Sequence, residues 1–452
     1  MPRQPAIFLS AILMIAASSA AQAVDPAPAN IPDRDFSLLD FGGVGDGKTL
    51  NTNAFASAVK AIAAAGGGRL IVPKGSFLTL PFALVSRMDL HLDDGAVIRF
   101  PSDVTAYGLS PRPTPNQMKT LKDRYPALII GTDLADVAIT GAGIIDGAGA
   151  AWWNLTVTDN QGRTHADGEA KPKLIVLSNV HRVHVQGVTL RNSPRYHLVL
   201  RQCRDCLVEG AHLISPSDSP HTDGIDPISS DTVVIRDCDL DVGDDDVAVK
   251  ALDGPAANVL VENCRCAHGR GISIGSETYQ GIHDVTVRNC TFTGTLHGIH
   301  VKSARDRGNQ LYAFHFSNIA MKDVSLPLSI NLYYQDRQGQ ADRASLPLTA
   351  TTPFVHDIEI DGLTATGAAN AGEIIGLPES PLKRVTLTNV SIVADKGMIV
   401  TDAQGVMFKN VRIDTLTGPP LVSNHADVSW DRSPSASQPT GAGSTRPDIP
   451  GR

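Results

Sequence analysis

The stretch Val259-Leu-Val-Glu-Asn-Cys-Arg-Cys266 returns 26 residues later as Val285-Thr-Val-Arg-Asn-Cys-Thr-Phe292. Both follow one pattern: apolar, any, apolar, polar, Asn or Gly, apolar, any, apolar. A third copy, Val233-Val-Ile-Arg-Asp-Cys-Asp-Leu240, has Asp in the fifth place. Alternation of apolar and polar residues over so few positions indicates short β-strands. Each copy therefore predicts two short strands joined by a bend at the fifth position.

The copies recur at a nearly constant interval. The third position of the pattern falls at 185, 208, 235, 261 and 287, which gives spacings of 23, 27, 26 and 26 residues. Weaker copies begin near 137, 206, 314, 358 and 406, and another clear copy spans 385–392. A period of 20–30 residues is typical of solenoids, because one unit cannot bury its apolar face without neighbours. We expect an all-β protein, a right-handed single-stranded parallel β-helix.

Two columns of the pattern support stacked coils. The sixth position is apolar in every copy and includes Cys238, Cys264 and Cys290, so we expect these thiols to be buried. Asparagine tolerates left-handed backbone geometry and can hydrogen-bond to its neighbour one coil away. The fifth position holds Asn263, Asn289, Asn318, Asn389 and Asn410.

The two ends of the chain differ from the repeats. Arg3, the short apolar run over 6–17 and Ala21-Gln22-Ala23 predict a signal peptide over residues 1–23, cleaved near Ala23, and hence a secreted or periplasmic protein. Residues 24–430 would form the β-helix domain, and the Ser-, Pro- and Gly-rich residues 431–452 a disordered tail. The Ala-rich stretch over 52–65 predicts a short helix that caps the first coil.

Charge and composition narrow the class of partner. The formal net charge is -8, which argues against nucleic acid as a partner. No stretch is apolar for long enough to span a bilayer, so we expect no membrane partner. No His/Cys spacing indicates a metal site and no Gly-rich loop precedes a helix in phosphate-binding fashion, so we expect neither metal nor cofactor. We expect a monomer.

Acidic residues gather at one repeat interval. Asp223 precedes Asp245 and Asp246 by about one coil, and neighbouring coils of a parallel β-helix lie about 4.8 Å apart. The next two coils carry Arg270 and then His300-Val-Lys302 on the same face. A cluster of carboxylates bordered by cations is what hydrolysis of an anionic glycoside requires.

Carboxylate pairs also bear on the mechanism. Two carboxyl groups about 6.5–9.5 Å apart leave room for a water molecule and predict inversion at the anomeric carbon. Crowding carboxylates together raises the pKa of at least one, which keeps it protonated as a general acid.

At these residues the chain resembles glycoside hydrolase family 28, the polygalacturonases. The resemblance extends from about Asp40 to at least Tyr334, and its ordered set of motifs is specific although each motif alone is weak. The pair Trp152-Trp153 and the run Gly275-Ser-Glu-Thr278 are most similar to those of bacterial endo-acting members. The matching stretches are Asp40-Phe-Gly42, Gly45-Asp-Gly47, Gly66-Gly-Gly68, Val72-Pro-Lys-Gly75, Gly141 to Gly147, Trp152-Trp153, Ser193 to His197, Thr222 to Asp226, Gly243 to Val247, Gly271 to Ser276 and His300 to Lys302.

The resemblance implies roles for individual residues. It makes Asp245 the general acid, while Asp223 and Asp246 position the attacking water, and it leaves Asp244 at the periphery. Lys302 matches the lysine that binds the substrate carboxylate, and Tyr334 matches a subsite tyrosine.

Three positions depart from the family pattern. The family's Asn-Thr-Asp begins with His221 here, its Gly-His-Gly contains Arg270, and its Arg-x-Lys begins with His300. The last two changes resemble an exchange of His and Arg between adjacent coils. Alternatively, His268 supplies the imidazole. We expect His221, His268, Arg270 and His300 to contact substrate.

The sequence predicts a hydrolase that cleaves α-1,4-galacturonic linkages of pectin with inversion, and endo action is favoured. An exo-acting or rhamnogalacturonan-directed relative is the alternative within the family. A β-helical lyase would instead hold calcium at residues 244–246 and use Arg270 or Lys302 as the base. A non-catalytic glycan-binding solenoid is a third class.

Overall fold

The structure is a computed structural model that describes residues 25–158, 164–166, 171–334 and 344–431. The expected signal peptide and the residues after 431 lie outside these ranges. The last strand, β31 (Leu421–Asp431), ends one residue beyond the expected domain boundary at 430. Within the described ranges, no helix is long and apolar enough to cross a membrane.

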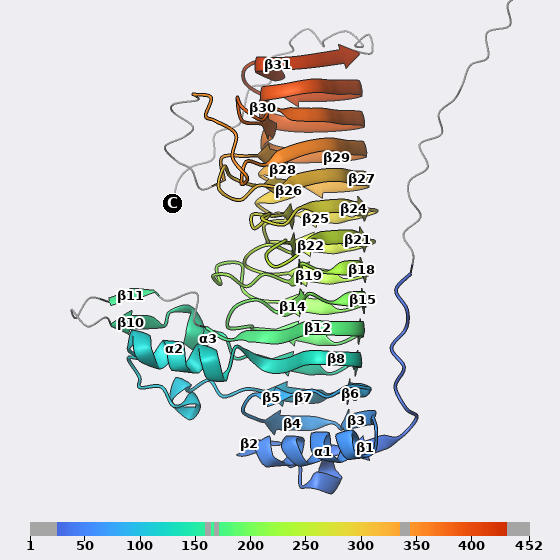
Figure 1. The fold of residues 1–452 in the computed structure, drawn as a ribbon, viewed down its shortest axis with the longest axis vertical. Coiled ribbons are helices and arrows are strands. Elements are labelled where there is room, and N and C mark those ends of the chain that lie inside the picture. Colours follow the sequence, from blue (N-terminus) through green and yellow to red (C-terminus); the bar gives the residue numbers. More distant parts are fainter. Residues whose placement is uncertain (1–24, 159–163, 167–170, 335–343, 432–452) are drawn as a thin grey trace, which may run out of the picture.

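The chain forms a right-handed parallel β-helix whose strands lie in three stacks along one axis (Figure 1). We call the first the repeat stack; it contains β1 (Asp35–Ser37), β3 (Gly68–Val72), β6 (Met88–Leu92), β15 (Arg204–Glu209), β18 (Asp231–Arg236), β21 (Ala256–Glu262) and β24 (Ile282–Arg288).

A second row of strands, the pocket stack, follows another side of the coils. It contains β5 (Phe82–Ala83), β14 (Leu198–Arg201), β17 (Ile225–Ile228), β20 (Val247–Val249), β23 (Ile272–Ile274), β26 (His297–Lys302) and β28 (Leu326–Asn331).

The third stack consists of strands of three to five residues. They are β2 (Asp46–Leu50), β4 (Gly75–Leu78), β7 (Ala96–Arg99), β9 (Ile144–Asp146), β13 (Thr189–Arg191), β16 (His212–Ile214), β19 (Asp239–Asp241), β22 (Arg265–Ala267) and β25 (Thr291–Thr293). Longer strands run through the bends into more than one stack: β8 (Ala127–Gly141), β12 (Lys173–Gln186), β27 (Gln310–Lys322), β29 (Phe354–Ile375) and β30 (Leu382–Thr415).

The register confirms the repeat. Val233 pairs with Val259 and Val259 pairs with Val285, so residues one period apart lie side by side. The asparagine column is confirmed as well: Asn263 and Asn289 both have φ of 55°, and the Asn289 side chain donates to Asn263 Oδ1 at 3.2 Å. Cys238, Cys264 and Cys290 are buried free thiols, as expected.

Each coil contains one strand more than the pattern predicts. The eight-residue pattern covers the repeat stack and the third stack, whereas the pocket-stack strands have no repeated sequence of their own. Strands β20 and β23 are only three residues long, and the turns that precede the pocket-stack strands carry the acidic residues. The site is therefore positioned by the pocket-stack strand of each coil, which the sequence repeat did not predict.

The predicted capping helix is confirmed as α1 (Thr52–Ala64), which follows the short 3-10 helix η1 (Leu38–Phe41). Phe55, Ala58 and Ile62 are fully buried where α1 covers the first coil (Figure 1). The helix ends where the Gly67 N–H donates to Ile62 O at 3.0 Å, and Gly67 has a φ of 121° that favours glycine.

A lobe projects from the coils that contain β8 and β12 (Figure 1). Trp152 is fully buried in this lobe, with its ring centroid 5.1 Å from that of Tyr107, so it is a packing residue. The projecting lobe consists of η2 (Val104–Tyr107), α2 (Pro115–Arg124), α3 (Ala150–Trp153), β10 (Thr156–Thr158) and β11 (Thr164–Ala166).

Candidate active site

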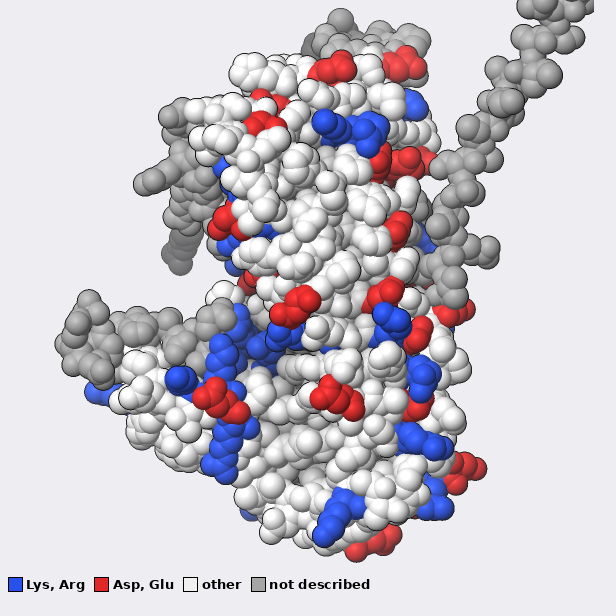
Figure 2. Space-filling view, viewed as in Figure 1, with Lys and Arg blue, Asp and Glu red and all other residues white. Residues whose placement is uncertain are grey.

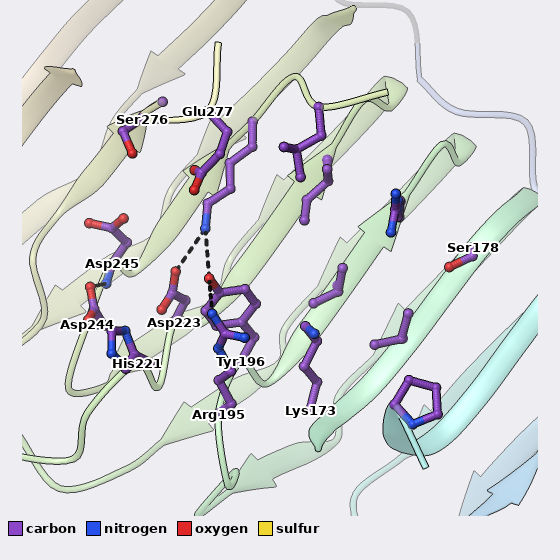
Figure 3. A pocket seen from close by; sticks show the side chains of 18 of the residues that line it. Lys173, Ser178, Arg195, Tyr196, His221, Asp223, Asp244, Asp245, Ser276 and Glu277 are labelled. Atoms are coloured by element: carbon purple, nitrogen blue, oxygen red, sulfur yellow. Dashed lines mark hydrogen bonds and ion pairs between the residues drawn. The ribbon is translucent and has the colours of Figure 1, made fainter. Parts of the chain in front are cut away.

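A pocket of about 690 Å³ lies on the pocket stack and extends from β8 to β26 (Figure 3). Its lining is basic although the chain is acidic overall: it contains seven Lys or Arg residues and four Asp or Glu residues. Figure 2 shows basic side chains gathered where the projecting lobe meets the coils. A local basic groove therefore exists on an acidic protein, as an anionic substrate would require.

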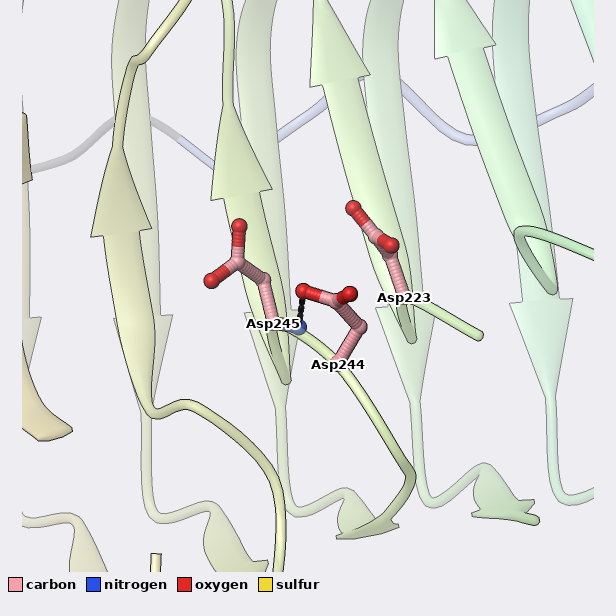
Figure 4. Close-up of side chains that lie close together, drawn as sticks. All are labelled: Asp223, Asp244 and Asp245. Atoms are coloured by element: carbon pink, nitrogen blue, oxygen red, sulfur yellow. Dashed lines mark hydrogen bonds between the residues drawn. The ribbon is translucent and has the colours of Figure 1, made fainter. Parts of the chain in front are cut away.

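Three aspartates meet in this pocket. Asp223 lies two residues before β17, and Asp244 and Asp245 lie in the turn before β20 (Figure 4). One carboxylate oxygen from each lies within 4.8 Å of the others, and all three residues are buried. Gly224 allows the two turns to approach, since a Cβ there would lie 2.4 Å from Asp246 O. The predicted adjacency of Asp223 and Asp245 is confirmed.

Asp245 is held as a carboxylate by groups from later coils. Lys302 Nζ lies 2.7 Å from Asp245 Oδ2, and Ser273 Oγ donates to Asp245 Oδ1 at 2.7 Å. Burial opposes ionisation of Asp245, but the surrounding basic groups, Lys302 foremost, together outweigh burial and lower the pKa of Asp245 to about 2. Asp245 is therefore ionised at neutral pH and unsuited to donate a proton.

Asp223 has a buried cation of its own. Lys250 donates to Asp223 Oδ2 at 3.3 Å and forms an ion pair with Asp226 Oδ2 at 2.9 Å. Burial and the neighbouring carboxylate of Asp226 raise the pKa of Asp223, against the pull of Lys250. Carboxylates this close repel one another, which disfavours the simultaneous ionisation of all of them.

Asp244 is bordered by more exposed groups. Arg270 Nε lies 3.6 Å from Asp244 Oδ1, His221 Nδ1 lies 3.9 Å from Asp244 Oδ2, and the Asp245 N–H donates to Asp244 Oδ1 at 3.0 Å. The side chains of His221 and Arg270 are 54% and 46% exposed, so both can move to contact a ligand. Within the described ranges, Asp244 forms no ion pair with a lysine.

The structure places Asp246 outside the pocket, against our expectation. It is fully buried, and its Oδ2 accepts a hydrogen bond from the Gly271 N–H at 2.8 Å. A Cβ on Gly269 would lie 2.4 Å from the same carboxylate, so the side chain points into the interior against two glycines. Successive residues entering a strand face opposite sides, which turns Asp246 away from Asp245. Burial raises the pKa of Asp246 well above its usual range.

The remaining predicted residues divide between the pocket and its surroundings. Arg270, Lys302, Tyr334 and His221 line the pocket, and Lys302 Nζ lies 5.2 Å from the Tyr334 ring centroid. His268 does not: its side chain is 61% exposed on the third stack, where Nδ1 pairs with Asp241 at 2.9 Å. The expectation that His268 supplies an imidazole to the site is therefore corrected. His268 directly follows β22, which belongs to the third stack, so its side chain lies on another face of the coil than the pocket.

His300 lies behind the pocket wall. Its ring stacks on His297 with centroids 4.0 Å apart, and its Nδ1 lies 3.3 Å from Ser273 Oγ. Burial, together with the charge of Lys302, lowers the pKa of His300 well below its usual value, so the ring is neutral. His300 is connected to Asp245 through Ser273, and the Arg270 guanidinium lies in the pocket while the His300 imidazole lies outside it.

Sequence reasoning missed Lys250 and Ser273. Ser273 lies within the Gly271–Ser276 motif, and Lys250 lies three residues after the motif that ends at Val247. The signal for Ser273 was its place between two apolar residues in β23, where alternation brings it onto the outer face, and Lys250 follows β20 directly on the face that Ala248 shares.

Comparison with known proteins identifies the family of this chain. The family model of glycosyl hydrolases family 28 matches residues 69–418. A probable polygalacturonase of Vitis vinifera is 32% identical over 82% of this chain and 77% of its own length. An endo-polygalacturonase of Pectobacterium carotovorum is 28% identical over 77% of this chain and 86% of its own.

A solved structure resembles the fold closely. The exopolygalacturonase of Thermotoga maritima superposes with a TM-score of 0.73 and 26% identity, covering 86% of this chain and 94% of its own. Because the family model covers most of the β-helix and the acidic pocket lies within the matched residues, this chain belongs to glycosyl hydrolases family 28 and is a glycoside hydrolase.

Proposed function

We propose that the protein is a polygalacturonase, which hydrolyses α-1,4 linkages between galacturonic acid residues. One observation carries the proposal: three buried carboxylates meet within 4.8 Å in a pocket whose other charged groups are mostly cationic. The carboxylates suit acid–base cleavage of a glycosidic bond. The surrounding cations suit a substrate that bears a carboxylate on each sugar.

We assign the general acid to Asp244, in place of the Asp245 assignment that the sequence favoured. Asp223 and Asp245 each contact a buried lysine, which favours their ionised form against the effect of burial, whereas Asp244 contacts no lysine among the described residues. Asp223 and Asp245 would therefore hold the attacking water and accept its proton. Asp244 would donate the proton to the leaving oxygen.

Lys302 and Arg270 are proposed to bind the carboxylate of the sugar at the cleavage point, with Tyr334 beside it. Lys302 offers a point charge and Arg270 a planar fork that can bind a carboxylate in bidentate fashion. His221 is proposed to contact substrate at the rim. His300 would act through Ser273 on Asp245 and would not touch the sugar.

Inversion is proposed on different grounds from those of the sequence. The oxygens of the three carboxylates approach more closely than the 6.5–9.5 Å of a two-carboxylate inverting pair, so their separation does not support it. Its support is the third carboxylate, which lets two groups hold water while another protonates the leaving group. Proton NMR of the first-formed anomer tests the stereochemistry.

The mode of attack is proposed to be exo, where the sequence favoured endo. The projecting lobe stands at the β8 and β12 coils, whose residues Pro126 and Lys173 form one end of the pocket (Figure 1). We propose that the lobe closes this end of the groove, which favours a chain terminus over a mid-chain segment. Exo action predicts early release of short products with little loss of polymer viscosity, and endo action predicts the reverse.

Export through the expected signal peptide and a monomeric state remain proposals. Amino-terminal sequencing of exported protein tests cleavage near Ala23, and light scattering tests the oligomeric state.

The decisive experiment is product analysis on polygalacturonate, its methyl ester and rhamnogalacturonan, with and without chelator. Hydrolysis of polygalacturonate gives saturated reducing ends and continues in chelator. A calcium-dependent lyase would give ultraviolet-absorbing unsaturated ends and stop in chelator, and a glycan-binding solenoid would give no products. Cleavage confined to rhamnogalacturonan would reassign the substrate.

A further inference from the structure

Lys250 is a buried lysine directly after β20 that no catalytic motif explains. Its side chain is 7% exposed, and its ammonium group lies 3.3 Å from Asp223 Oδ2, 2.9 Å from Asp226 Oδ2 and 3.5 Å from the Tyr196 hydroxyl. The ammonium also lies 4.5 Å from the centroid of the Tyr196 ring. Figure 3 shows Asp223 and Tyr196 side by side, with a dashed line from each to this group.

We propose that Lys250 is a positioning residue for Asp223: Asp226 and Tyr196 anchor its ammonium group, and that group orients the pocket carboxylate and favours its ionised form. The inference deepens the proposed function and rests on it, because Asp223 is there assigned to hold the attacking water.

The placement of the two carboxylates distinguishes this role from simple charge neutralisation. Asp226 lies within β17, is fully buried and does not line the pocket, whereas Asp223 lies three residues earlier and does. A lysine that only neutralised an interior aspartate would need no second partner. Lys250 instead connects an interior anchor to a carboxylate that faces the substrate.

Asp245 shows the same arrangement one coil later. Lys302 Nζ lies 2.7 Å from Asp245, so each carboxylate proposed to hold water has its own buried lysine. Asp244, the proposed proton donor, has no lysine partner among the described residues. The distribution of lysines therefore follows the distribution of proposed roles.

The charge effect has a definite sign. The titratable or charged groups that face Lys250 or its partners are Tyr196, Arg195, Asp223, Asp226, Asp244, Asp245, Glu277 and Lys302. Lys250 lowers the pKa of Asp223, and burial and the nearby carboxylates raise it. Without Lys250 the pKa of Asp223 rises further. Because Asp223 acts in its ionised form, activity then begins to fall at a higher pH, and the acidic limb of the kcat/KM profile moves to higher pH.

The test uses Lys250→Met and the double variant Lys250→Met/Asp226→Asn. We expect Lys250→Met to lower kcat on polygalacturonate about 100-fold, with KM within about 3-fold, and to lower Tm because Asp226 loses its cation. The double variant removes the stranded Asp226 charge, so its Tm should recover while kcat stays low. Recovery of both Tm and kcat in the double variant would show a purely structural role and overturn the proposal.

A second readout does not depend on the substrate. In protein labelled with ¹³C at aspartate carboxyls, the Asp223 signal, assigned by its loss in Asp223→Asn, should titrate at least one pH unit higher in Lys250→Met than in wild type. An unchanged Asp223 titration would overturn the proposal. If wild type leaves polygalacturonate intact, the function fails while this titration still decides whether Lys250 acts on Asp223.

Discussion

The repeat stack and the pocket stack belong to the same coils but are built on opposite principles. In the repeat stack, Val233, Val259 and Val285 lie in one column and an asparagine ladder crosses the adjoining bend. In the pocket stack, β20 and β23 shorten to three residues, and the column position of Ala248 in β20 becomes Ser273 in β23 and His300 in β26. The regular repeat allows the coils to stack, and the site lies where the sequence departs from that repeat.

Charge separates the two stacks further. Inward positions of the repeat stack hold valines and neutral thiols, which pack without needing partners. The pocket stack buries three carboxylates and two lysines in ion pairs across four successive coils. Removing one partner of a buried ion pair strongly destabilises the fold, so substitutions in the pocket stack should affect stability as well as activity. Substitutions should therefore divide cleanly between the two stacks.

The largest effect should come from the water-holding carboxylates. Asp245→Asn should lower kcat about 10⁴-fold, because it removes the ionised group that binds and deprotonates the water. Circular dichroism should show the fold intact, and reducing-end assays measure the loss. A variant that keeps a tenth of wild-type activity would break the assignment.

Asp244→Asn should lower kcat on polygalacturonate about 10³-fold, since the leaving oxygen then departs without a proton. On an aryl galacturonide with an acidic phenol the loss should be far smaller, because that leaving group needs no acid. Equal losses on both substrates would contradict a proton-donating Asp244, and Asp223→Asn, which should lose both activities equally, is the matched control.

Lys302→Met should reduce kcat/KM about 10- to 100-fold and change the pH dependence. The pKa of Asp245 is lowered to about 2 while Lys302 is present, and loss of the cation raises it. A carboxylate with a lowered pKa is active above that pKa, so raising it moves the acidic limb of the kcat/KM profile to higher pH. An unchanged acidic limb would show that Lys302 does not control the ionisation of Asp245.

Asn289→Ala, on the ladder beside the repeat stack, should have the smallest effect. It removes hydrogen bonds to Asn263 and from Asn318 and places alanine at a φ of 55°, so it should lower the free energy of unfolding by about 1–2 kcal/mol. Denaturant titration measures that loss, and kcat should stay at its wild-type value. A large fall in kcat in the folded variant would break the division between the stacks.

The sequence alone predicted the features that depend on the repeat interval of the coils. The coil interval predicted the β-helix, the asparagine ladder, the buried thiols and the approach of Asp223 to Asp245. It could not tell which of Asp244 and Asp246 faces the pocket, because that depends on how the backbone turns between Gly243 and Val247.

Lys250, Ser273 and the true position of His268 escaped for a related reason. Their roles depend on the pocket stack, a strand in each coil that has no repeated sequence, and on contacts between coils at unequal separations: 27 residues for Lys250 and Asp223, 28 for Ser273 and Asp245, 57 for Lys302 and Asp245. No single period reveals such contacts.

The most direct test compares two neighbours in one turn, Asp244→Asn and Asp246→Asn, by the rate of new saturated reducing ends on polygalacturonate. Asp246 is buried with a raised pKa, and an amide can still accept the Gly271 N–H, so Asp246→Asn should stay within about 10-fold of wild type. Asp244→Asn should fall at least about 100-fold below it. The opposite order, with Asp246→Asn inactive and Asp244→Asn active, would contradict the placement of the chemistry at Asp223, Asp244 and Asp245.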